Sequence, residues 1–160
     1  MPNTDDRLLL RHAIATVAYR GGKTLRGAPE AFATFRVREG SRTPIETLSH
    51  MGDLFDWALS IAAGTQVWHD SIPLSWDSEV ARFFDSLRRF DDHLASDAPL
   101  ACPAEQLLQG PVADALTHVG QLAMLRRLAG APIRGENYFK AEITSGRVGS
   151  DQAVPRREFD

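Results

Sequence analysis

Three polar residues interrupt an apolar, helix-forming segment at residues 110–130, and their types and spacing suit metal chemistry. Asp114, His118 and Gln121 follow an i, i+4, i+7 pattern, so a helix would present all three on one face. Burying a carboxylate and an imidazole on such a helix is costly unless a partner satisfies them. The side chains therefore either pair with one another and with a neighbouring helix, or hold a metal ion.

A metal ion needs ligands that converge from rigid elements. Asp114 and His118 would supply two ligands from one helix, and a facing helix must supply the third. His50 is the best candidate for that third ligand. Two imidazoles and one carboxylate suit zinc, nickel or iron, and they leave coordination positions open to water or substrate. In the alternative, Asp114 and His118 form a local ion pair, His50 bonds a neighbouring polar group, and Gln121 borders a polar pocket.

Four other residues with reactive side chains are expected to have structural or solvated positions rather than roles as ligands or catalytic groups. His12 is the best substitute for the third ligand, but it suits the boundary between interior and surface. His69, in a loop, and His93, near the end of a helix, are expected to be solvated. Cys102 lies between two prolines and is expected to be a loop residue rather than a catalytic thiol. As the only cysteine, it also rules out an internal disulfide, which favours a cytoplasmic location.

Four long helices are expected to position the candidate ligands. The first should end at Gly21-Gly22. The second has a capping box at its start, because threonine, proline and glutamate stand at positions 43, 44 and 46. The fourth has Pro111 at its start, and Arg126-Arg127 should form a solvated corner near its end. The expected helices cover residues 4–20, 44–63, 77–94 and 110–130, with core aromatic residues at Trp57, Phe83, Phe84 and Phe90.

The connections between these helices are long. Residues 23–40 should hold one short helical turn, 65–76 form a loop, and 96–109 contain another turn at 104–108. Residues 135–160 form an irregular tail that either wraps the domain or packs on a partner chain. With no convincing strand and no repeat, the pattern predicts one all-α domain, residues 1–160, built as a four-helix bundle with long crossing loops.

Composition argues against several classes of protein. The chain has 160 residues, 43% of them hydrophobic, enough for one domain with a proper core. A net charge of −3 gives no electrostatic reason to bind nucleic acid or an anionic membrane surface. No apolar run approaches the ~18–20 residues of a membrane span. The first residues are acidic where a signal peptide would be basic.

Two segments resemble motifs of the DinB-like (DinB/YfiT) superfamily of metalloenzymes. Residues 47–57, TLSHMGDLFDW, resemble its second-helix motif, in which a histidine is often followed by an aromatic residue along the same helix. Residues 116–122, LTHVGQL, resemble its fourth-helix motif, in which a histidine precedes a small residue and Gln-Leu or Gln-Ile. The resemblance spans nearly the whole chain in element order and is specific at these two motifs.

This resemblance implies an up-up-down-down four-helix bundle with a three-histidine metal site, often containing zinc or nickel. His50 and His118 match two of those ligands, and Asp114 stands where the third histidine would be. We therefore expect two histidines and one aspartate to hold a divalent metal, with Gln121 orienting one ligand.

The expected function is a metal-dependent transferase or hydrolase that uses a low-molecular-weight thiol, in a homodimer. The alternative is a non-catalytic dimeric bundle, stress-associated or binding a small molecule, whose metal site is vestigial.

Overall fold

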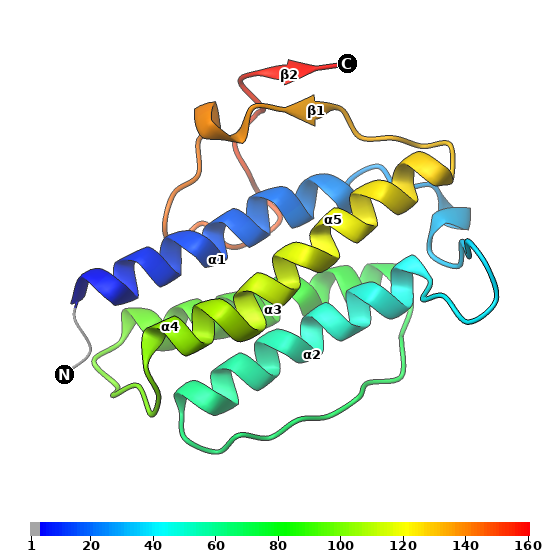
Figure 1. Ribbon diagram of the computed structural model, residues 1–160. Coiled ribbons are helices and arrows are strands. Elements are labelled where there is room, and N and C mark those ends of the chain that lie inside the picture. The colour runs from blue at the N-terminus through cyan, green and yellow to red at the C-terminus, as the bar shows by residue number, and fades with distance from the viewer. Residues whose placement is uncertain (1–3) are drawn as a thin grey trace.

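The computed structural model describes residues 4–160, and their fold is mostly helical (Figure 1). The long helices are α1 (Thr4–Leu25), α2 (Pro44–Ala62), α3 (Trp76–Ala95) and α5 (Ala113–Leu128), and α4 (Ala104–Leu107) is a short one. The predicted all-α class is confirmed. Within the described residues, no helix is both long enough and apolar enough to cross a membrane.

Helices α1 and α2 both pack against α3 and α5. Arg7, near the start of α1, donates to the carbonyl oxygen of Leu94 at the end of α3, so these helices run antiparallel. Arg82, near the start of α3, donates a hydrogen bond to Ser49 Oγ, near the start of α2. Helices α2 and α3 therefore run parallel, as Figure 1 shows. Arg126, near the end of α5, donates to the carbonyl oxygen of Thr24, near the end of α1, so α5 runs parallel to α1. The order is therefore up-down-down-up, and the predicted up-up-down-down order is wrong.

The loop at residues 65–75 explains this order. In Figure 1 it runs back along the whole length of α2 before α3 begins. Eleven residues of extended chain reach roughly 36 Å, which exceeds the roughly 28 Å length of the 19-residue helix α2. The connection is therefore long enough for α3 to start at the same end of the molecule as α2.

Helix α1 continues through Gly21-Gly22, where it was predicted to end. A Cβ atom on Gly21 would lie 3.2 Å from Cζ of Phe83, and one on Gly22 would lie 3.4 Å from Cζ of Phe84. These glycines therefore let α1 and α3 approach closely instead of breaking the helix. The helix ends just before Gly27, whose φ of 64° suits a residue without a side chain.

The start of α2 confirms the predicted capping box. The backbone N–H of Glu46 donates to Thr43 Oγ1 at 3.3 Å, and the backbone N–H of Thr43 donates to Glu46 Oε2 at 2.7 Å. Gly64 follows the helix with a φ of 88°. This cap determines the register of α2, and with it the direction in which His50 points.

The fourth predicted helix differs from the structure at both ends. Pro111 does not start it: α4 continues through a π-helical turn, Leu108–Val112, into α5. Proline clashes with the carbonyl four residues earlier in a regular α-helix, and the wider π turn relieves that clash. Arg126, predicted to be solvated, is 6% exposed and donates to the carbonyl oxygens of Thr24 and Arg26 at 3.0 Å. The last carbonyl groups of a helix lack backbone N–H partners, and the guanidinium of Arg126 supplies hydrogen-bond donors to those at the end of α1.

The core lies between the four long helices, and Phe83 and Phe90 in it are fully buried, as predicted. Phe55 packs with both rings, at centroid distances of 6.3 Å. Trp57 and Phe84 are partly buried against the same core. The aromatic residues of α2 and α3 thus serve packing.

The C-terminal tail wraps the molecule along α1 (Figure 1). It contains two short antiparallel strands that the sequence did not predict, β1 (Gly135–Glu136) and β2 (Glu158–Phe159). The buried carboxylate of Glu136 accepts hydrogen bonds from Tyr19 at 2.5 Å and from Lys23 at 2.7 Å. These bonds attach the tail together with Val148, which is 4% exposed and belongs to the core. Neither kind of contact produces a periodic pattern, and so the sequence pattern did not reveal the strands.

Candidate metal centre

The structure brings His50, Asp114 and His118 together from two facing helices. His50 Nε2, on α2, lies 3.7 Å from Asp114 Oδ2, and His118 Nε2, on α5, lies 3.5 Å from Asp114 Oδ1. The two imidazole rings meet edge to face, with centroids 4.8 Å apart. One donor atom from each residue lies within 4.8 Å of the others, so the group could hold a metal ion.

Gln121 lies beside this group, one turn beyond His118. Its Oε1 atom is 2.7 Å from His118 Nδ1. Because an amide oxygen only accepts hydrogen bonds, this contact requires a proton on Nδ1, so that in the neutral ring Nε2 carries the lone pair. The contact therefore holds the ring in the tautomer that a metal ligand requires.

His50 is also in the form suited to bind a metal. Burial lowers its pKa below the ordinary value of 6.5, the charges of Arg42 and His118 lower it further, and Asp114 partly opposes them. The imidazole is therefore neutral at neutral pH, as metal binding requires. The ring also makes an edge-to-face contact with Trp68, at a centroid distance of 5.6 Å.

The donor set fits a small divalent ion. Ligands bound to zinc at about 2.0–2.2 Å in tetrahedral geometry lie roughly 3.4 Å from one another. The separations of 3.5 and 3.7 Å from the two imidazoles to Asp114 are close to that value, with one carboxylate oxygen facing each ring, and a set of one donor atom per residue lies within 4.8 Å. The side chain of Asp114 is 47% exposed, whereas that of His118 is 9% exposed. Solvent or a small molecule can thus reach the group from the aspartate side.

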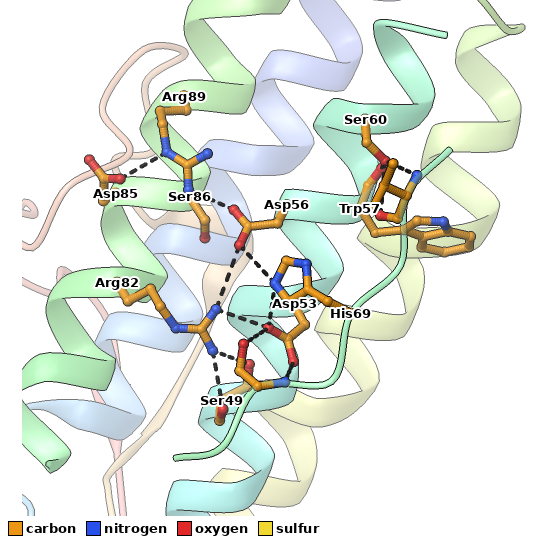
Figure 2. Close-up of polar contacts among 12 residues, drawn as sticks. Ser49, Asp53, Asp56, Trp57, Ser60, His69, Arg82, Asp85, Ser86 and Arg89 are labelled. Carbon is orange, nitrogen blue, oxygen red and sulfur yellow. Dashed lines mark hydrogen bonds and ion pairs between the residues drawn. The ribbon is translucent and has the colours of Figure 1, made fainter. Parts of the chain in front are cut away.

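A second group of potential ligands is formed by Asp53, Asp56 and His69, and its carboxylates already pair with an arginine. Arg82 Nη1 lies 3.0 Å from Asp53 Oδ1 and 3.6 Å from Asp56 Oδ2 (Figure 2). Asp53 also accepts hydrogen bonds from Ser71, at 2.6 Å and 2.8 Å. We therefore interpret this cluster as a buried ion-pair network that attaches the 65–75 loop to α2 and α3.

His69 is an exposed loop residue, as predicted, with its side chain 47% exposed, but it also belongs to that network. Its Nε2 atom lies 3.1 Å from Asp53 Oδ1 and 3.4 Å from Asp56 Oδ2, and Figure 2 shows the ring directed at both carboxylates. Asp53 and Asp56 stand out in the sequence as part of a polar stripe on α2. The partner could not be identified there, because the path of the loop is not encoded in a periodic pattern.

The remaining candidates lie outside the group. His12 is exposed, which agrees with a boundary position and not with the third ligand. His93 was predicted to be solvated, but its Nε2 atom is buried without a hydrogen-bond partner among residues 4–160. It lies three residues after Phe90, at the edge of the buried face of α3. Burial, and next the charge of Glu105, raise the pKa of the Cys102 thiol, which makes it a poor nucleophile.

The chain matches no protein-family model, no curated protein and no solved structure.

Proposed function

We propose that this protein is a metal-dependent enzyme of the DinB-like superfamily, with His50, Asp114 and His118 as the ligands of zinc, nickel or iron. The observation that carries the proposal is the convergence of these three side chains from α2 and α5. The two motifs that resemble the family lie on facing helices, with their histidines in edge-to-face contact. In this proposal α1, α2, α3 and α5 correspond to the family's four-helix bundle.

The ion would supply Lewis acidity and lower the pKa of a bound water or thiol, and thereby create a nucleophile at neutral pH. The protein's own groups prepare the site for it. Gln121 fixes the tautomer of His118, burial keeps His50 neutral, and Trp68 covers the ring of His50. Because the side chain of Asp114 is half-exposed, a substrate could approach the metal from the side of this residue. We propose transfer or hydrolysis with a low-molecular-weight thiol as the reaction class.

A second candidate function follows from the same residues. Asp114 stands where the family motif has a histidine, and at 3.5 Å from His118 it can pair with that residue without any metal. The protein would then be a non-catalytic helical dimer with a vestigial site. The proposed homodimer rests on the family analogy and on Phe139, a large apolar residue of the tail that is 88% exposed and that a partner chain could bury.

Elemental analysis of the purified, untagged protein separates the two functions. We expect about one zinc, nickel or iron per chain, lost in Asp114→Ala and in His118→Ala. His12→Ala is the matched control, because this exposed histidine lies outside the group and should leave the metal content unchanged. Failure to bind any of the three metals, even after incubation with their salts, would overturn the enzyme proposal and favour the vestigial site.

A further inference from the structure

An open groove of about 600 Å³ lies beside the candidate metal centre, between the start of α2, α5 and the segment that precedes α2. Three large apolar residues on it, Val37, Met124 and Leu128, are 50%, 52% and 54% exposed. A row of half-exposed apolar side chains beside a polar cluster is typical of a small-molecule site. Residues that line the groove include Val37, Thr47, Gln121, Met124, Leu125 and Leu128.

Gln121 connects the groove to the candidate ligands. It lines the groove, and its Oε1 atom also bonds Nδ1 of His118 at 2.7 Å. A molecule lying in the groove would therefore touch a residue that orients the site. This contact makes the groove a candidate for the substrate-binding surface of the proposed enzyme.

Arg42 is the one charged side chain among the described residues that line the groove. Its exposed guanidinium makes no hydrogen bond or ion pair with any residue between 4 and 160. It also borders a smaller hollow of about 160 Å³ that reaches His50. An unpaired guanidinium beside an apolar surface has the donors to bind a carboxylate through two parallel hydrogen bonds.

The carboxylates near Arg42 are already engaged. Glu46 borders the smaller hollow, where it accepts from the backbone of Thr43 and lies 3.5 Å from Arg36. Asp53, in the same hollow, is bonded to Ser71 and Arg82. Asp70, which also borders the hollow, accepts a hydrogen bond from Trp68 Nε1 at 3.2 Å. Arg42 is thus left as the cation available to a ligand in the groove.

We infer that the groove binds an organic carboxylate with an apolar chain, whose carboxylate pairs with Arg42 and whose chain lies on Val37, Met124 and Leu128. The assignment of this molecule as a substrate rests on the proposed function, but its binding does not. A second copy of the chain is the other occupant that such a surface could have, and the experiment distinguishes the two.

Octanoate is a suitable probe, because it combines a carboxylate with an unbranched apolar chain. Calorimetric titration should show saturable binding of octanoate, with octan-1-ol and acetate binding at least about tenfold more weakly. Arg42→Gln should weaken octanoate binding by about tenfold or more, and Met124→Gln should weaken it as well. Arg38→Gln is the matched control, because this exposed arginine of the same segment does not line the groove.

The titration is done on protein with and without zinc, beside a light-scattering measurement of the molar mass. If octanoate binds through Arg42 but the chain binds no metal, the groove inference stands and the enzyme proposal falls. If zinc binds but octanoate does not, or binds equally well to Arg42→Gln, the groove inference is wrong. A dimer that is broken by Met124→Gln and does not bind octanoate would also overturn it, because the groove would then be an interface between copies.

Discussion

Gln121 Oε1 lies 2.7 Å from Nδ1 of His118, so that an amide on α5 determines which imidazole nitrogen faces Asp114. Replacing the amide by an apolar side chain of similar size removes the acceptor and frees the ring to turn or to change tautomer. Outer partners of this kind typically contribute about 10–100-fold to metal affinity. Gln121 is thus a positioning residue for the proposed centre.

We predict that Gln121→Leu weakens zinc binding by about 10–100-fold without abolishing it. Competition with a chromophoric chelator would measure the change in affinity. Gln106→Leu is the control, because it makes the same substitution at an exposed position of α4, where affinity should not change. Equal affinities of Gln121→Leu and the unmodified protein would show that the hydrogen bond plays no part in metal binding.

The network around Arg82 should contribute strongly to stability. Its guanidinium pairs with Asp53 and Glu79, which are only 3% and 1% exposed. Arg82→Met would leave Glu79 buried without a cation and Asp53 with only Ser71 and His69 as partners, so we predict a loss of about 3–5 kcal/mol in the free energy of unfolding. Urea denaturation measures it.

Arg88→Met provides the comparison, since within residues 4–160 Arg88 pairs only with the exposed Asp85 and Asp92 on its own helix. This variant should unfold at nearly the same urea concentration as the unmodified protein. Similar midpoints for Arg82→Met and Arg88→Met would mean that the loop network is as weak as a surface ion pair.

Regular sequence patterns predicted much of this structure, and the failures have identifiable causes. The capping box at Thr43 and the i, i+4 spacing of Asp114 and His118 are local features, and both are confirmed in geometry. Gly21-Gly22 predicted the end of a helix, but there the glycines allow α1 to pack closely on α3. Pro111 predicted the start of a helix, but a π-helical turn accommodates it within one. His50 could be named as the best candidate on a facing helix, but no spacing rule relates residues so far apart in the chain, and the resemblance supplied the matching position.

Other features had no signal in the sequence pattern. The partners of His69 depend on how the 65–75 loop runs across α2, and the burial of Arg126 depends on carbonyl groups at the end of α1. Ion pairs and hydrogen bonds between distant segments produce no periodicity. Polar contacts that form only in the folded chain are therefore the part of the site that sequence reasoning missed.

Two helical glycines should respond in opposite ways to replacement by alanine. A Cβ atom on Gly52 would lie 2.8 Å from Cζ of Arg82, which its carboxylate partners hold in place. We predict that Gly52→Ala lowers the free energy of unfolding by about 1–3 kcal/mol. A Cβ atom on Gly120 would meet no other described residue within 4 Å. Gly120→Ala should therefore raise the free energy of unfolding by about 0.5–1 kcal/mol. Thermal unfolding of both variants tests the pair, and a stabilised Gly52→Ala would contradict the close contact with Arg82.

The C-terminal tail should detach more readily in acid, because its attachment depends on charge. Lys23 Nζ lies 2.7 Å from Glu136 and 2.9 Å from Glu158. The hydrogen bond from Lys23 lowers the pKa of Glu158 below its ordinary value of 4.5. Burial alone would lower the pKa of Lys23, but its bonds to Glu136 and Glu158 raise it above 10.5. Both charges are therefore present at neutral pH, where the attachment is strongest.

The direction of the pH dependence follows from these shifts. A carboxyl group with a lowered pKa in the folded state stabilises the protein fully above its unfolded pKa, and this contribution is lost as the pH falls through the folded value. We predict that Glu158→Gln lowers the unfolding midpoint at neutral pH and that the difference disappears below the folded pKa. Glu142→Gln is the matched control, because Glu142 pairs with Arg156 within the exposed tail. A difference between Glu158→Gln and the unmodified protein that stays constant down to acid pH would show that the charge of Glu158 does not hold the tail.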